Sequence, residues 1–395
     1  MPQSEWRKHQ AEFIARLERM GLIKFPWIRE ALDKSPRHLF IQTIVPPKKR
    51  APEKVDEDSP SGDHLEAIYS DEVVTIRENP SYSSSSQPSL MLAMLTDLDI
   101  RPGNRVLEIG TGTGWNAALL ACGTGKDDLV FSMDNQDDLV QHAGDNLTHS
   151  GFPRVNLKAG DGVHGWPENS PFDRIIVTAS SRDIFIAWIK QLAEGGILLV
   201  PFRIGTLADP VLKIVKKEGM FTGNFTRWSA FTEIKTPARD TTEPLQQPQL
   251  DQLADQLQAL SHENGFIPLP AAAADDWWHY FADLQFFLHL NGWNFHQGWL
   301  GTNSLYMCHE AKMVMAYSRN QPVLKLFGED EACAKVRNLS QEWGALGSPG
   351  IEKYGVRIVP PEITAKAEAE WIERGAQTAL LISLQPPQNH FQARA

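Results

Sequence analysis

The sequence predicts an α/β protein in which a doubly wound, Rossmann-like sheet is followed by a second, smaller α/β domain. The 395 residues exceed what one domain of ~100–200 residues holds. Helix and strand patterns alternate from residue 89 to residue 200, as expected for a parallel sheet with helices on both faces. A stretch rich in Pro, Gln and Thr at 237–249 separates this half from further α/β patterns.

The composition is that of a globular protein, with 42% hydrophobic and 22% charged residues. A formal net charge of −11 repels phosphate backbones and argues against a nucleic-acid partner. The N-terminus is polar and no apolar stretch reaches the ~18 residues of a membrane span, so we expect a cytoplasmic protein without a membrane partner. The three cysteines are scattered, which favours buried thiols over disulfides or a zinc cluster.

Residues 1–68 are predicted to form N-terminal helices and a charged insert. Apolar residues recur at three- and four-residue spacings over 4–22, and a second helix is expected at 27–33. Proline and charge dominate 45–62 without any periodicity, which indicates a surface loop or a mobile insert.

Residues 69–238 are predicted to form the first α/β domain and residues 250–395 the second. In the first domain we expect strands at 105–110, 129–134, 154–159, 173–178 and 196–200, and helices at 89–98, 115–122, 136–149 and 182–192. In the second domain an aromatic run at 277–281 precedes expected strands at 322–327, 354–359 and 378–384 and expected helices at 329–343 and 362–374.

A glycine-rich turn follows the strand expected at 105–110. Its glycines are Gly110, Gly112 and Gly114, and the acidic Glu108 precedes them. In a doubly wound sheet this turn lies at the edge where ligands bind, and glycine lets the backbone approach a cofactor closely. The third glycine of a dinucleotide-binding turn would fall on Trp115, which is too large for that position. The spacing therefore favours S-adenosylmethionine and a class I methyltransferase sheet.

Two aspartates end the next strands. Asp134 closes the strand at 129–134, and an ionised carboxylate there can accept bonds from both hydroxyls of a ribose. Asp161 lies in a turn between Gly160 and Gly162, where it can accept a bond from an adenine amino group. Each aspartate alone is equally typical of a turn or a helix cap, so their order after the glycine turn carries the prediction.

Several further motifs agree in order and spacing with one family. They are Gly160-Asp161-Gly162, Gly165-Trp166, Pro171-Phe172-Asp173 followed by the strand to Ala179, Gly195-Gly196, Leu199-Val200-Pro201, Ser84 to Pro88, and Ser35 to Phe40. With the glycine turn they resemble the protein-L-isoaspartate (D-aspartate) O-methyltransferase family. The resemblance covers about residues 5–235 and is interrupted by the insert at 45–65.

The resemblance implies roles for individual residues. Ser86 is expected to be the catalytic residue beside the point of methyl transfer and the incoming carboxylate, with Ser84, Ser85 and Gln87 binding the substrate. The cofactor contacts implied are Glu108, Gly110, Thr111, Gly112, Gly114, Asp134, Asn135, Asp161, Gly162 and Thr178. The family's Thr-Ile pair is replaced by Ser84-Ser85, and the residues after Pro88 also depart from the family, which puts the acceptor in doubt.

The resemblance also implies a function: methylation of an aspartyl or isoaspartyl carboxyl of a protein or peptide, with S-adenosylhomocysteine as the product and a succinimide forming from the ester. Relatives with an added C-terminal domain are associated with ribosomally made peptides, and the second domain here favours that role through peptide recognition. General isoaspartate repair, a small-molecule methyltransferase and a non-catalytic binding protein remain alternatives. A nucleic-acid methyltransferase is disfavoured because no Asn-Pro-Pro-Tyr-like segment follows the fourth strand.

Residues 250–395 contain six of the 12 tryptophans, which fits a peptide groove or large core side chains. Four histidines in this region suggest a metal, but the helical His-Glu-x-x-His pattern is missing, and we expect no metal site. These histidines are His279, His289, His296 and His309. The sequence leaves the oligomeric state open.

Overall fold

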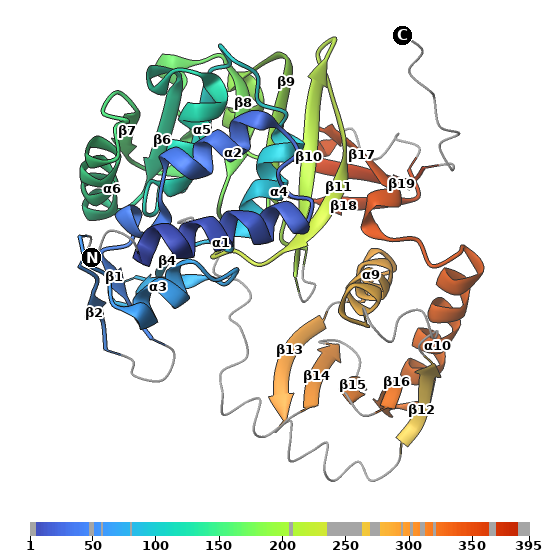
Figure 1. Cartoon of the computed structure of the whole chain (residues 1–395). Coiled ribbons are helices and arrows are strands. Elements are labelled where there is room, and N and C mark those ends of the chain that lie inside the picture. Colours follow the sequence, from blue (N-terminus) through green and yellow to red (C-terminus); the bar gives the residue numbers. More distant parts are fainter. Residues whose placement is uncertain are drawn as a thin grey trace.

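The structure is a computed structural model (Figure 1), and it describes residues 5–46, 51–56, 58–79, 81–204, 208–234, 263–268, 277–293, 295–300, 303–308, 313–318, 321–362 and 369–385. The predicted linker at 237–249 lies outside these ranges. Within them, no helix is long and apolar enough to cross a membrane.

The N-terminal part forms helices that share one hydrophobic core with residues on one face of the large sheet. They are α1 (Glu5–Arg19), α2 (Pro26–Lys34), the 3₁₀ turn η2 (Arg37–Phe40) and α3 (Gly62–Ile68). The segment expected to be a featureless loop contains β2 (Glu53–Lys54), which pairs with β1 (Thr43–Ile44) and is followed by the buried Val55. The loop expectation was wrong for these residues, because a two-residue bridge leaves no periodic pattern in a sequence.

Each helix and strand expected between residues 89 and 200 is present. In chain order they are α4 (Pro88–Leu98), β5 (Val106–Ile109), α5 (Trp115–Thr124), β6 (Val130–Asp134), α6 (Asp137–His149), β7 (Asn156–Ala159), β8 (Phe172–Val177), α7 (Ile186–Gln191) and β9 (Leu192–Pro201). A short hairpin of β3 (Val74–Arg77) and β4 (Ser83–Ser85) precedes them. The hairpin of β10 (Asp209–Lys217) and β11 (Met220–Ser229) was not predicted.

Ten of the described strands form one large sheet in the order β18-β19-β17-β11-β10-β9-β8-β5-β6-β7, in which β17 is Tyr354–Val359, β18 is Trp371–Arg374 and β19 is Ala379–Leu384. Strands β5 to β9 pair in parallel, and the chain reverses direction along the sheet between β7 and β8. This confirms the doubly wound class I methyltransferase-like sheet. The carboxyl ends of β5, β6 and β8 meet at the switch point, where open α/β sheets bind ligands.

The range 250–395 divides between two sheets. Five strands form a separate antiparallel sheet: β12 (Glu263–Pro268), β13 (Phe295–Leu300), β14 (Asn303–Cys308), β15 (Met313–Ser318) and β16 (Gln321–Gly328). Three others extend the large sheet, because β17 (Tyr354–Val359) pairs with β11 and is followed by β18 (Trp371–Arg374) and β19 (Ala379–Leu384). The helix expected at 362–374 was wrong at its C-terminal end, where Trp371 to Arg374 pair with β19; residues 363–368 are not described.

Two helices accompany the C-terminal strands, α9 (Trp277–Leu290) and α10 (Asp330–Ala345). The aromatic run at 277–281 is the first turn of α9. This helix lies between the two sheets (Figure 1), with Ala282 and Phe286 buried against the large sheet and Phe281, Leu284 and Phe287 buried against the small one. A helix that is apolar all round is expected where both of its faces are covered.

Candidate active site

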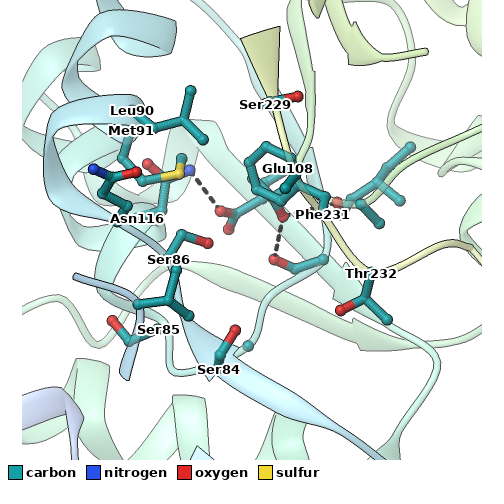
Figure 2. Close-up of a pocket in the computed structure, with 18 of the residues that line it drawn as sticks. Ser84, Ser85, Ser86, Leu90, Met91, Glu108, Asn116, Ser229, Phe231 and Thr232 are labelled. Atoms are coloured by element: carbon teal, nitrogen blue, oxygen red, sulfur yellow. Dashed lines mark hydrogen bonds between the residues drawn. The ribbon is translucent and has the colours of Figure 1, made fainter. Parts of the chain in front are cut away.

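A cavity of about 1190 Å³ runs along the carboxyl ends of β5, β6 and β8 and continues to β11 and α9. Figure 2 shows Ser84, Ser85 and Ser86 on one side of it and Phe231 and Thr232 on the other. Every site residue predicted from the sequence lines this cavity except Gly114. The cavity exceeds the ~300–1,000 Å³ of a typical ligand pocket, which leaves room for a cofactor together with an acceptor.

The glycine turn has the backbone that its spacing requires. Gly110 has φ +110° and Gly112 has φ +51°, conformations that side chains disfavour. A Cβ atom on Gly110 would lie 2.3 Å from the Oγ1 atom of Thr178. That hydroxyl donates to the Gly110 carbonyl at 2.8 Å, so Thr178 stabilises the turn from β8. The turn thus offers bare backbone to a ligand at the switch point.

Gly114 plays a different role from the one predicted. It begins α5 with φ +84°, and a Cβ there would approach Ala143 and Leu147 of α6 to 3.2–3.3 Å. The residue is needed for close packing of α5 on α6, and it does not line the cavity. A glycine pattern alone cannot separate these two needs, because both favour the same residue.

The aspartates lie where parallel strands end. Asp134 ends β6, and its Oδ2 atom accepts a hydrogen bond from the Gly112 amide at 3.1 Å. Burial raises the pKa of this carboxyl above its ordinary value. Asp161 accepts a bond from the Val163 amide at 3.0 Å and caps a short 3₁₀ turn, η4 (Gly162–His164). Both carboxylates and Asn135 line the same crevice as the glycine turn.

Gly162 keeps its end of the crevice narrow. A Cβ atom there would lie 2.5 Å from the Cγ2 atom of Ile109 on β5. The residue therefore lets the loop after β7 approach the loop after β5. Its carbonyl accepts a bond from the Nε1 atom of Trp188 at 2.8 Å, which anchors the loop on α7.

Glu108 is fully buried at the base of the cavity. Its carboxylate accepts bonds from Asn116 Nδ2 at 2.7 Å and from Ser132 Oγ at 2.6 Å. Burial raises its pKa to about 7 in spite of these bonds. Thr111 lies 2.8 Å from the same Ser132 hydroxyl, so its side chain belongs to this buried network.

Asn116, which the sequence analysis missed, has a buried Oδ1 atom without a hydrogen-bond partner. The residue lines the cavity, and an unpaired buried acceptor is costly unless a ligand satisfies it. An amino group of a bound cofactor is a suitable donor. The sequence contains one feature that points to Asn116: the residue lies two positions after Gly114, the last glycine of the turn.

Residues 84–86, which we call the serine segment, are held in place by Arg37. The sequence analysis did not assign this arginine to the site. Its guanidinium is buried and donates to the carbonyls of Ile68 at 2.7 Å and Ser86 at 2.9 Å, and to the Ser85 hydroxyl at 3.3 Å. Burial lowers the Arg37 pKa to about 9. The Ser85 hydroxyl therefore contacts the protein, while Ser84 and Ser86 line the cavity beside it.

Asp71 stabilises the start of α4, the helix that follows the serines. Its carboxylate accepts bonds from the Ser89 amide at 2.8 Å and from Gln87 Nε2 at 3.4 Å. Gln87, for which a substrate contact is predicted, is the residue that precedes the helix, and it lines the cavity. The two bonds fix the end of the serine segment against the helix.

The far wall of the cavity comes from β11 and the C-terminal region. It contains the loop after β11, three residues of α9 and two residues of the 3₁₀ turn η7 (Ile351–Lys353): Trp278, His279, Asp283, Ile351 and Glu352. The sequence analysis marked the aromatic run at 277–281 without placing it at the site. The position of a helix in the sequence does not show whether the helix lines a cavity that is formed by residues far away in the chain.

The arrangement fits S-adenosylmethionine. The crevice combines bare glycine backbone, a half-buried carboxylate at the end of β6 and an unpaired buried acceptor on Asn116. These groups match a nucleoside sugar and a cofactor amino group. Among the described residues, no group of three or more His, Cys, Asp or Glu side chains is arranged to hold a metal ion.

Comparison with known proteins agrees with this geometry. The model of the protein-L-isoaspartate(D-aspartate) O-methyltransferase family matches residues 8–232. A protein-L-isoaspartate O-methyltransferase from Pyrococcus horikoshii is 34% identical over 218 residues, which are 55% of this chain and 88% of the relative. A protein of the same name from Methanoculleus marisnigri is 35% identical over 54% of this chain and 84% of its own.

A solved protein-L-isoaspartate O-methyltransferase has the same fold with a TM-score of 0.52, at 23% identity, over 88% of this chain and 96% of its own. The solved structure of a protein with a similar description from Plasmodium falciparum, in complex with S-adenosyl-L-homocysteine, covers 57% of this chain and 98% of its own at 19% identity, with a TM-score of 0.47. The family match covers more than half of the chain and the fold and crevice agree with it. The chain therefore belongs to the protein-L-isoaspartate(D-aspartate) O-methyltransferase family, whose methyl donor is S-adenosylmethionine and whose acceptors are proteins.

Proposed function

We propose that this enzyme methylates an aspartyl or isoaspartyl carboxylate of one ribosomally made precursor peptide, so that a succinimide or isoaspartate forms at a chosen position. The observation that carries the proposal is the continuous cavity, which begins at the glycine turn and ends on α9 and η7 of the C-terminal region. An acceptor bound there would contact residues that lie beyond the family match at 8–232.

The chain's own residues supply binding and alignment. S-adenosylmethionine, when bound, provides a methyl group made electrophilic by its sulfonium. Asp134 would accept bonds from the ribose hydroxyls and Asn116 Oδ1 a bond from an amino group, which fixes the donor's direction. The glycine backbone at 110–112 would allow close approach.

The acceptor needs no general base. A carboxylate with an ordinary pKa of about 4 is ionised at neutral pH, so its oxygen already has the attacking electron pair. The transfer forms an oxygen–carbon bond and breaks a sulfur–carbon bond, and no proton moves. The Ser86 hydroxyl would donate to the second carboxylate oxygen, and Arg37 holds the Ser86 carbonyl so that this hydroxyl keeps its position.

The side of the cavity opposite the serines, with Phe231 and Thr232, would exclude water from the reacting oxygen. After release, the amide nitrogen of the following residue in the acceptor would attack the ester carbonyl and expel methanol. This ring closure requires no group of the enzyme.

General isoaspartate repair is the second candidate. The curated relatives are named protein-L-isoaspartate O-methyltransferases, and the fold of a solved structure with that name extends over 88% of this chain. A C-terminal region is therefore compatible with either role, and substrate selectivity is what separates them.

The test is a methylation assay with S-adenosylmethionine and matched peptides that carry Asp or isoaspartate at the same position, together with every short peptide encoded beside the gene. Mass spectrometry follows the gain of a methyl group and the later loss of methanol. Methylation of Asp in one encoded peptide, but not in its scrambled sequence, supports the proposal. Methylation of isoaspartate in any sequence, and of Asp in none, would replace it with repair.

A further inference from the structure

The cavity has an end that no predicted cofactor contact reaches. Trp278 and Asp283 of α9 line it, together with Trp228 of β11. We call these three residues the tryptophan–aspartate subsite. Trp278 and Asp283 lie beyond the family match at 8–232 and Trp228 lies within it, so the subsite contains residues from both parts of the chain. Only an acceptor that extends past the cofactor crevice could contact it.

The carboxylate of Asp283 is held in one orientation. Trp228 Nε1 donates to its Oδ1 atom at 3.0 Å, and the Ile351 amide donates to the same atom at 3.2 Å. One donor comes from β11 and the other from η7, so both halves of the molecule position this group. Oδ2 is then the oxygen to which a ligand in the cavity would donate.

Two indole rings accompany this carboxylate. The rings of Trp228 and Trp278 are perpendicular, with centroids 6.5 Å apart. The face of an indole is electron-rich and attracts a cation within ~6 Å of its centroid. A carboxylate next to aromatic faces is a combination that favours a guanidinium or ammonium group over a neutral one.

Among the neighbouring groups, the carboxylate of Glu352 adds to this preference. Glu352 lines the same end of the cavity, and burial together with Glu352 raises the pKa of Asp283 to about 6. A bound cation would offset this effect and favour the ionised form. Arg227 also lines the cavity, but Asp97 accepts two bonds from its guanidinium, at 3.0 and 2.5 Å, so this arginine is already paired.

We propose that the tryptophan–aspartate subsite binds a lysine or arginine side chain of the acceptor peptide near the carboxylate that is methylated. The inference rests on the proposed function, because it assumes a peptide in the cavity. The subsite would make the C-terminal region a determinant of sequence specificity, with Oδ2 of Asp283 accepting a bond from the cation and an indole face packing against it.

The experiment uses the full chain and two sets of peptides, one with a single Asp and one with a single isoaspartate. In each set a lysine is placed at every nearby position in turn, and each lysine peptide has a partner with neutral acetyl-lysine. We expect wild-type kcat/KM to be about tenfold or more higher for lysine than for acetyl-lysine at one position or a few adjacent ones. Equal values at all positions would overturn the inference and leave the proposed function intact.

Variants of the subsite test whether its residues cause the preference for lysine over acetyl-lysine. Asp283→Asn keeps an acceptor for Trp228 and Ile351 and should remove the lysine preference, so that kcat/KM becomes equal for each lysine peptide and its acetyl-lysine partner. Trp278→Leu should reduce the preference in the same way if the Asn variant folds poorly. Glu331→Gln, at an exposed carboxylate of α10, is the matched control and should keep the wild-type preference. A uniform loss on charged and neutral peptides in both subsite variants would overturn the assignment.

Cofactor binding separates the two proposals. S-adenosylhomocysteine affinity, measured by calorimetry, should be unchanged in Asp283→Asn, because the subsite lies away from the glycine turn. If the wild-type chain binds S-adenosylhomocysteine but methylates no peptide of either set and none encoded beside the gene, the proposed function fails and the subsite assignment fails with it.

Discussion

At the cofactor end of the cavity, glycine backbone and strand ends set the shape, whereas at the far end side chains from β11 and α9 do. Gly110 and Gly112 lie in a turn between two consecutive elements, so their geometry is local in sequence. Trp228 and Asp283 are 55 residues apart and meet through one hydrogen bond. The comparison shows why a sequence motif predicts one end of the cavity and predicts nothing about the other.

The two ends also differ in their dependence on the rest of the fold. Three C-terminal strands extend the large sheet, and α9 covers Phe225 and Trp228. Deleting the C-terminal region would expose this face and the edge of β11, so a truncated chain is a poor test of recognition. Point substitutions at either end of the cavity therefore test recognition better than a deletion does.

The largest effect is expected for Gly110→Val. The new side chain would collide with Thr178, whose Oγ1 atom lies 2.3 Å from the Cβ position, at a φ of +110°. We expect S-adenosylhomocysteine affinity to fall by about a hundredfold or more in calorimetry. Gly219→Ala is the control, because this residue also has a positive φ but its Cβ position is in open space. Similar affinity in wild type and Gly110→Val would break the assignment of this turn.

Arg37→Lys tests the segment between the two ends. The ammonium of a lysine has three N–H donors on one nitrogen and cannot serve the five carbonyls that accept bonds from the Arg37 guanidinium, so buried carbonyls lose their donor. We expect a loss of about 3 kcal/mol in the free energy of unfolding, measured with urea, and a higher acceptor KM. S-adenosylhomocysteine affinity should change much less than KM. A parallel loss of both would mean that Arg37 supports the whole site and not the serine segment.

Glu108→Gln tests the buried network through pH. The folded-state pKa of Glu108, about 7, lies above the ordinary value of 4.5, so the folded protein holds a proton that the unfolded chain releases. This contribution to stability is fully present below pH 4.5 and is lost as the pH rises to about 7. The stability of wild type relative to the variant should therefore fall by at most about 3 kcal/mol over this window, measured by urea unfolding.

The exposed Glu66 of α3 offers a control for that series, since Glu66→Gln changes a glutamate outside the network. A difference between wild type and Glu108→Gln that stays constant with pH would contradict the raised pKa.

The smallest effect is expected for Asp134→Asn. The amide keeps one acceptor for the Gly112 donor but removes the charge that would accept two ribose hydroxyls. We expect S-adenosylhomocysteine to bind about tenfold more weakly, with the acceptor's lysine preference unchanged. Asp145→Asn, at an exposed position on α6, is the matched control. Unchanged affinity would remove the ribose assignment, and a changed lysine preference would show that the two ends are coupled.

The sequence predicted much of the cofactor crevice, because its residues are fixed by local backbone requirements at strand ends. It could not separate Gly110 and Gly112, which line the cavity, from Gly114, which packs against α6. It also missed Arg37 and Asn116, since a buried donor or an unpaired acceptor is defined by its surroundings and not by its spacing.

By itself the sequence determined the order of strands and helices from residue 89 to residue 200, the glycine turn with its acidic neighbours and the family resemblance, because periodicity and turn chemistry act over short stretches. Only the tertiary structure decided that β17 to β19 extend the large sheet and that α9 closes the cavity. Strand pairing and burial depend on contacts between residues far apart in the chain, and a pattern of residue types does not specify which distant partner each element meets.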